Sequence, residues 1–244
     1  IEVSFTPKKI SDSTYFHYSN EVWGETNLVN CLNFHQKENI NYSFKIVPDS
    51  NRIVVYHPNV KNIRFTYHII QDSKDENPKS RNRPRVQKEF FHILGQSLFM
   101  VPEEIFESNI DDPKITANIE WVNFPKNFII HNTFGSRELQ QNLHVLLWSE
   151  FYHSLFVGGD YRIKSFTYLD KPIFLAIRGN WLKDYTDDNL FAALQKTIPT
   201  QRQFWNDNNF DYYTVILTPT ITQTDSIYKG QSITGSAVKN GFLI

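Results

Sequence analysis

The chain has 244 residues and a formal net charge of −1, and 40% of its residues are hydrophobic. Such a balanced charge excludes the strongly basic surface by which proteins bind nucleic acid or anionic membranes, so we expect no nucleic-acid partner. No apolar run reaches the roughly 18 residues that a membrane-spanning helix needs, so we expect no membrane span.

The chain holds a single cysteine, Cys31, which excludes an intramolecular disulfide. Its apolar neighbours Val29, Leu32 and Phe34 indicate a buried thiol in a strand rather than a reactive nucleophile. The low cysteine count fits the cytoplasm and is also compatible with a periplasm. Because the chain opens on Ile1 without an initiator methionine, its N-terminus reads as trimmed, which favours a periplasmic or secreted protein that has lost a signal peptide.

Alternating apolar residues in the first half predict antiparallel strands with one buried face. The alternation is clearest in residues 42–46, 63–69 and 115–121. Two apolar runs, residues 52–56 and 97–101, are further strand candidates. No segment before residue 130 holds a long helical period. We therefore expect an all-β N-terminal domain over residues 1–140, built as an antiparallel sandwich.

Residues 71–85, QDSKDENPKSRNRPR, contain no aliphatic side chain and alternate in charge. Such a segment buries too little surface to order itself, so we expect a solvated, mobile loop between strands. Its three arginines, Arg81, Arg83 and Arg85, leave a second interpretation open, namely contact with an anionic partner.

The second half changes character. Residues 171–179 and 212–219 are nearly continuous apolar runs, which are typical of strands covered on both faces. Between them, residues 186–205 have capping side chains at the start and apolar residues at helical spacing, which predicts a helix that Pro199 kinks or divides in two. We expect an α/β unit over residues 141–244, and the α+β class for the whole chain.

No catalytic motif occurs in the sequence. Gly158 and Gly159 follow an apolar run but lack the spacing of a dinucleotide-binding site, so they predict a tight turn. A phosphate-binding loop and a nucleophile elbow are also missing from the sequence. We assign no catalytic residue within residues 1–244.

Eight histidines invite a search for a metal site, but none stands in a zinc-binding spacing. Two Glu-x-x-His pairs occur, Glu89 with His92 and Glu150 with His153, and His144 lies close to the second pair. A carboxylate-bridged metal pair needs such motifs on facing helices, whereas these surroundings read as β or irregular. We interpret the spacing as chance and predict no metal site and no cofactor in this chain.

Four phrases of the second half stand in a recognisable order: FVGGDYRIKSFTYLDKPIFLAIRGNW, a helix ending in QRQFWND, DYYTVILTPT, and a Gly/Ser loop that leads into KNGFLI. This order resembles the entry to the catalytic domain of gluzincin zinc metallopeptidases, above all the glycyl aminopeptidase family. GQSLFMVPE, residues 95–103, is similar to the N-terminal domain of that family. The resemblance implies a β-rich N-terminal domain followed by a truncated start of a thermolysin-like domain. Zinc is then expected only in a longer protein, and this chain by itself is expected to be inactive.

By the same resemblance, a loop near the C-terminus borders the substrate cleft, so the candidate substrate-binding residues are Gly235, Ser236, Lys239 and Asn240, and a peptide is the implied substrate. Relatives commonly place a glutamate in this loop to bind the free amine of the substrate, whereas GSAVKN contains no acid. Either the amine is bound elsewhere or aminopeptidase specificity is absent.

The last ten residues, 235–244, are expected to belong to a strand at the edge of the second sheet, or to the approach to one. The alternative is a mobile tail. We expect the apolar residues 242–244 to be partly uncovered, which leaves self-association through this segment open.

Two functions of different class therefore remain. The chain is either the N-terminal portion of a zinc aminopeptidase-like enzyme or a non-catalytic β-rich module that binds a peptide or protein, as a degenerate peptidase would. Trp23, Trp148 and Trp181 are candidate anchors for a partner in the second case, although packing in the core is the default role of each.

Overall fold

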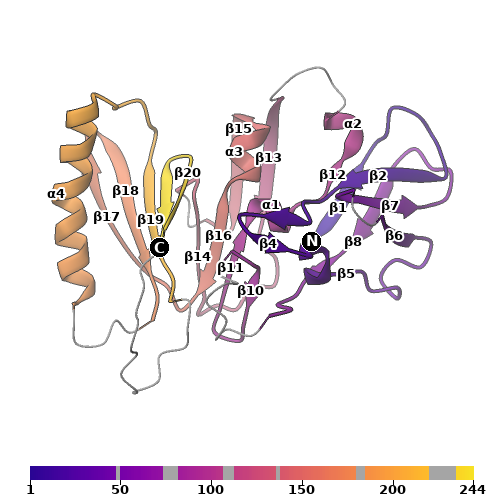
Figure 1. Cartoon of the computed structure of the whole chain (residues 1–244), viewed down its shortest axis with the longest axis horizontal. Coiled ribbons are helices and arrows are strands. Elements are labelled where there is room, and N and C mark those ends of the chain that lie inside the picture. Colours follow the sequence, from indigo (N-terminus) through magenta and orange to yellow (C-terminus); the bar gives the residue numbers. More distant parts are fainter. Residues whose placement is uncertain (48–49, 74–81, 107–112, 136–137, 180–184, 220–234) are drawn as a thin grey trace.

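The computed structural model describes residues 1–47, 50–73, 82–106, 113–135, 138–179, 185–219 and 235–244. Three regions follow one another along its long axis (Figure 1). The N-terminal strands lie at one end, a second group of sheets lies in the middle, and a mixed sheet covered by the long helix α4 lies at the other end. Strands predominate and helices are few, so the fold belongs to the predicted α+β class.

The N-terminal region contains one four-stranded antiparallel sheet in the order β12-β2-β7-β6. Its strands are β2 (Ser13–His17), β6 (Ser43–Val47), β7 (Arg52–Tyr56) and β12 (Val101–Pro102). Three two-stranded pairs accompany it: β1 (Glu2–Phe5) with β8 (Ile63–Thr66), β3 (Glu21–Val22) with β4 (Glu25–Thr26), and β5 (Leu32–Asn33) with β9 (His68–Ile69). A 3-10 turn, η1 (Leu28–Cys31), joins β4 to β5. Whether these sheets close into the predicted sandwich stays a prediction.

Aromatic side chains dominate the core of this region. Its largest fully buried members are Tyr18, Tyr67, Phe16, Leu28, Ile53 and Ile63. Phe16 and Phe65 meet edge to face with ring centroids 5.3 Å apart, a geometry that aromatic pairs favour. The predicted strand at 52–56 coincides with β7, in which the three central residues are buried.

The strand predicted at 97–101 is wrong. Residues Gly95–Leu98 form a single helical turn, α1, and the strand β12 begins only at Val101. Two buried tyrosines take the place of a strand partner: the Tyr18 hydroxyl donates to the Ser97 carbonyl at 3.0 Å, and the Tyr67 hydroxyl donates to the Leu98 carbonyl at 2.6 Å. Since buried carbonyls must be paired, these bonds satisfy the turn without a ladder.

The middle region contains a four-stranded antiparallel sheet in the order β10-β11-β16-β14. Its strands are β10 (Arg85–Val86), β11 (Phe90–Leu94), β14 (Ile129–Asn132) and β16 (Leu155–Gly159). Beside it lie the pair of β13 (Lys114–Glu120) with β15 (Gln140–Leu147) and the short helix α3 (Trp148–Tyr152), whereas the short helix α2 (Glu103–Phe106) contacts β2 and β12 of the N-terminal region. Both sheets therefore pair strands from either side of residue 140, and the position of a domain boundary stays a prediction.

The tight turn predicted at Gly158 and Gly159 is wrong, because both glycines lie inside the buried strand β16. A Cβ atom on Gly158 would stand 2.3 Å from the Phe91 ring, and one on Gly159 would stand 2.2 Å from the Glu89 carbonyl oxygen. The glycines are thus required by the close approach of β11, not by a reversal of the chain.

The third region is a five-stranded mixed sheet in the order β17-β18-β19-β21-β20. Its strands are β17 (Arg162–Tyr168), β18 (Lys171–Ile177), β19 (Tyr213–Leu217), β20 (Ser236–Val238) and β21 (Gly241–Leu243). The two continuous apolar runs form β18 and β19, as the sequence predicted, and the structure pairs them in parallel. One face packs against the middle sheet through Ala176 and Ile216, and the other packs against α4.

The helix α4 (Asp187–Trp205) covers the outer face of the third sheet (Figure 1). Thr186 caps its start in a reciprocal pair of hydrogen bonds with Asn189, as the sequence predicted. Pro199 does not divide the helix, which is continuous. Trp205, which the helical spacing assigned to the apolar face, is 74% exposed. No helix in the described part of the chain combines the length and apolarity that a membrane span requires.

Candidate functional site

The hairpin of β20 and β21 forms one border of the third sheet. β21 lies between β19 and β20, and β20 is the outermost strand among those that the structure describes. The prediction of a strand at this edge is therefore confirmed for β20, while β21 lies one strand further in, and the alternative of a mobile tail is wrong for both strands. Leu243 is buried, while Phe242 and Ile244 are partly covered.

The ladder between the two strands determines which backbone groups of β20 point outward. Val238 pairs with Gly241 across a two-residue loop, and Ala237 pairs with Phe242. The residues that flank such a loop exchange the closing hydrogen bonds, and hydrogen-bonded pairs alternate with pairs that face away from each other. The N–H and C=O of Ala237 therefore point away from β21, towards the outer side of the sheet.

The four predicted substrate-binding residues all lie in or beside this hairpin. Gly235 precedes β20 and lies so close to Phe242 that a Cβ atom would stand 2.4 Å from the ring. Ser236 begins β20. Asn240 occupies the left-handed region (φ 54°) in the loop, and its carbonyl accepts a hydrogen bond from the Thr214 N–H at 2.9 Å. Lys239, also in the loop, forms an ion pair with Glu150 of α3.

A groove of about 340 Å³ lies along the outer side of β20. It is lined by residues from three separate elements: Ala237, Val238 and Lys239 from the β20 hairpin, Ser149, Glu150 and His153 from α3 and its end, and Trp23 from the β3–β4 hairpin. Among the predicted substrate-binding residues only Lys239 lines the groove. The N-terminal region, α3 and the third sheet thus all contribute residues to the groove.

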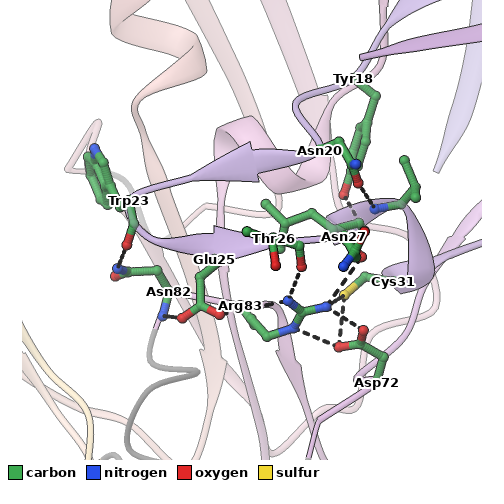
Figure 2. Close-up of polar contacts among 12 residues, drawn as sticks. Tyr18, Asn20, Trp23, Glu25, Thr26, Asn27, Cys31, Asp72, Asn82 and Arg83 are labelled. Atoms are coloured by element: carbon green, nitrogen blue, oxygen red, sulfur yellow. Dashed lines mark hydrogen bonds and ion pairs between the residues drawn. The ribbon is translucent and has the colours of Figure 1, made fainter. Parts of the chain in front are cut away.

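Hydrogen bonds from Asn82 and Arg83 anchor the β3–β4 hairpin (Figure 2). The carboxylate of Glu25 accepts a hydrogen bond from the Asn82 N–H at 3.2 Å, and the Asn82 side chain donates to the Trp23 carbonyl at 3.3 Å. Arg83 donates to the Thr26 carbonyl at 2.6 Å. These bonds connect the hairpin to the segment that follows residue 81, so that Trp23 is presented on a fixed support.

Arg83 is the centre of a buried polar cluster (Figure 2). Its guanidinium pairs with Asp72 and lies 3.7 Å from the Glu25 carboxylate. Burial alone would raise the pKa of Asp72, but hydrogen bonds from Arg83 and Cys31 outweigh burial and lower the pKa. The prediction of a solvated loop is therefore wrong at Arg83 and also at Arg85, which is buried, whereas Arg81 lies outside the described residues.

Cys31 belongs to the same cluster. The thiol is buried as predicted, but it ends the 3-10 turn η1 instead of lying in a strand. Burial, together with the hydrogen bond to Asp72, raises the pKa of the thiol to about 12. Since the thiolate is the reactive form, this cysteine is inert at neutral pH.

Neither Glu-x-x-His pair forms a set of metal ligands. Glu89 is exposed while His92 is buried, and Glu150 is paired with Lys239. The Nδ1 atom of His153 lies 2.9 Å from the Ser149 carbonyl, and the described residues contain no group of three or more histidine, cysteine, aspartate or glutamate side chains that could hold a metal ion.

His92 instead connects the middle sheet to the third sheet. Its Nδ1 atom lies 2.9 Å from the Thr218 hydroxyl, which is also 2.8 Å from the Tyr161 hydroxyl. Burial, reinforced by the nearby charges of Arg85 and Arg178, lowers the pKa of His92 from 6.5 to about 3. The folded protein therefore holds this histidine in the neutral form.

The three tryptophans named as anchors differ in position. Trp148 is partly buried and packs against Phe151 in an aromatic cluster, so it has the default packing role. Trp181 lies outside the described residues. Trp23 is 41% exposed and lines the groove.

Sequence reasoning missed the parts of the groove that come together only in three dimensions. Ala237, Val238 and Ser149 were not singled out, and Glu150 and His153 were considered only as metal ligands. The ion pair between Lys239 and Glu150 joins residues 89 positions apart, so no local pattern reports it.

Comparisons with known proteins show the fold of this chain. No protein-family model matches the sequence, and no curated protein matches it either. Among solved structures, the chain resembles an aminopeptidase N family protein from Idiomarina loihiensis with a TM-score of 0.67 at 14% identity, over 99% of this chain and 39% of that one. An M1 zinc metallopeptidase from Deinococcus radiodurans gives a TM-score of 0.42 at 8% identity, over 91% of this chain and 52% of that one. The chain thus spans well under two thirds of these proteins, and its fold resembles that of the aminopeptidase N family protein over 39% of that protein's length.

Proposed function

We propose that this chain is the N-terminal portion of a zinc metallopeptidase of the aminopeptidase type, and that β20 binds an extended peptide by strand addition. The fold likeness to an aminopeptidase N family protein over nearly the whole chain supports the first part. The observation that carries the second part is the outermost strand β20 with a groove along its outer side. The described residues supply no set of zinc ligands, so we assign no catalytic step to them.

Strand addition suits the geometry of this edge. A peptide that adds to a sheet needs unpaired N–H and C=O groups on the last strand, and Ala237 points both of its groups outward. The side chains of Ser236 and Ala237 are small, so another backbone can approach without a clash. On the far side of the groove, Trp23 and α3 then contact the side chains of the bound peptide.

The substitution Ala237→Pro tests this proposal. Proline removes the outward N–H of Ala237 but leaves the bonds between β20 and β21 in place, and proline is tolerated at sheet edges. We expect the variant to fold normally and to bind the hexapeptide TVTFTV, called the Phe probe, about tenfold more weakly, because one peptide carbonyl loses its donor. Isothermal titration of the chain 1–244 with the Phe probe measures this change.

Ala237→Ser is the matched control, since serine keeps both the N–H group and a small side chain. It should bind the Phe probe as the parent chain does. Equal affinity of Ala237→Pro and Ala237→Ser, or a failure of the parent chain to bind the probe, would contradict strand addition at β20.

A non-catalytic peptide-binding module is the second candidate, and Lys239 is the observation that favours it. The family resemblance places an acid in this loop to bind the free amine of a substrate, but here the loop supplies an ammonium group, already paired with Glu150. A module without amine recognition binds the Phe probe equally well with its amine free or acetylated. A strong preference for the free amine instead favours the aminopeptidase-type site. Glu150, whose side chain lines the groove, is then the candidate carboxylate for binding the amine.

A further inference from the structure

The tip of the β3–β4 hairpin has an unusual residue for its conformation. Trp23 and Gly24 form a two-residue loop and both have positive φ, 50° and 81°. A turn with two positive φ angles is the type I′ turn, in which asparagine followed by glycine is strongly preferred. A bulky side chain in the left-handed region is strained, so the sequence keeps tryptophan at a position where asparagine would fit with less strain.

Trp23 belongs to none of the hydrophobic core clusters of the described residues. It is 41% exposed and lines the same groove as the β20 hairpin. The backbone beneath it is fixed by Asn82 and by the buried cluster around Arg83 (Figure 2). A strained backbone on a rigid support therefore holds a large aromatic surface at the side of the groove where the side chains of a bound strand would lie.

We propose that Trp23 is a specificity-determining residue, which selects peptides with an aromatic side chain at the position facing the hairpin tip. This inference rests on the proposed strand addition at β20. Side chains of an added strand point alternately to its two sides, so every second side chain lies on the side of the indole. An aromatic side chain packs on the indole with a large contact area, whereas alanine leaves the indole in water.

The test compares the Phe probe with the Ala probe, TVTATV, by isothermal titration. We expect the parent chain to prefer the Phe probe by about tenfold. Trp23→Asn should abolish this preference while its thermal unfolding midpoint stays equal to that of the parent or rises, because asparagine suits the turn. Trp205→Asn is the matched control: it removes another exposed tryptophan on α4 and should leave the preference unchanged.

Three outcomes overturn the inference. The first is a preference that persists in Trp23→Asn, and the second is a parent chain that binds both probes equally. The third is a lowered unfolding midpoint of Trp23→Asn, which means that the indole stabilises the fold by packing. Failure of the proposed function is distinguishable, because it leaves the Ala237→Pro variant with unchanged affinity, whereas failure of this inference alone leaves Ala237→Pro impaired.

Discussion

Replacing Arg83 by methionine is expected to lower the free energy of unfolding by about 3–5 kcal/mol. The reason is that Glu25, which is only 5% exposed, would lose the guanidinium that lies 3.7 Å from its carboxylate, and Asp72 would lose its ion pair with Arg83. The carbonyl of Thr26 would lose its donor as well. Urea unfolding followed by circular dichroism measures the change.

Two companion variants separate charge from geometry. Arg83→Lys keeps the positive charge but loses the paired donors, so we expect an intermediate loss of stability. Adding Asp72→Asn to the Arg83→Met variant removes the carboxylate that has lost its ion pair. The double variant should therefore regain part of the lost free energy of unfolding. A loss of under about 1 kcal/mol in Arg83→Met, the value usual for exposed ion pairs, would show that the cluster is solvated in solution.

Acid is expected to destabilise the protein through His92. In the folded protein this residue stays neutral down to about pH 3, whereas the unfolded chain binds a proton at this side chain below its ordinary pKa of 6.5. Unfolding therefore takes up a proton between these values, and stability falls as pH falls. Between about pH 6.5 and about pH 4.5 the loss from this histidine should be roughly 2 kcal/mol.

His92→Gln is the variant that isolates this effect, because glutamine can bond to Thr218 but does not titrate in this range. Burial also lowers the pKa of His17, which acts in the same direction, so the comparison between parent and variant is the informative quantity. Urea unfolding at several pH values should give a shallower dependence for His92→Gln. The same dependence in both proteins is incompatible with a buried neutral His92.

The elements that follow from local pattern could be predicted from the sequence. The apolar runs of β18 and β19 and the capped helix α4 carry their own signals, and the apolar end of the chain indicated the strand β21. Segments that depend on distant partners could not be predicted. The carbonyls of the turn at Ser97 are paired with two tyrosines from distant parts of the chain, and Gly158 is a glycine inside a strand because the Phe91 ring approaches it closely.

The candidate site divides in the same way. The loop that contains Lys239 was found by family resemblance. Its ion-pair partner Glu150 and the groove residue Trp23 come from remote parts of the chain. The composition of residues 71–85 wrongly predicted that Arg83 is exposed to solvent. A charged segment is expected to be solvated unless its ion-pair partners elsewhere in the fold, here Glu25, are known. The dipeptide Trp23–Gly24 did carry a local signal, since glycine in the second position of a two-residue loop between strands predicts a hairpin.

Amide hydrogen exchange at Ala237 tests the central claim most directly. In the free chain the Ala237 N–H points away from β21, so it should exchange rapidly, while the Val238 N–H is protected by the ladder and serves as the internal reference. Saturation with the Phe probe should slow exchange at Ala237 by about tenfold or more and leave Val238 unchanged, because the added strand supplies a carbonyl acceptor. A probe that binds while Ala237 continues to exchange at its free rate would contradict the account.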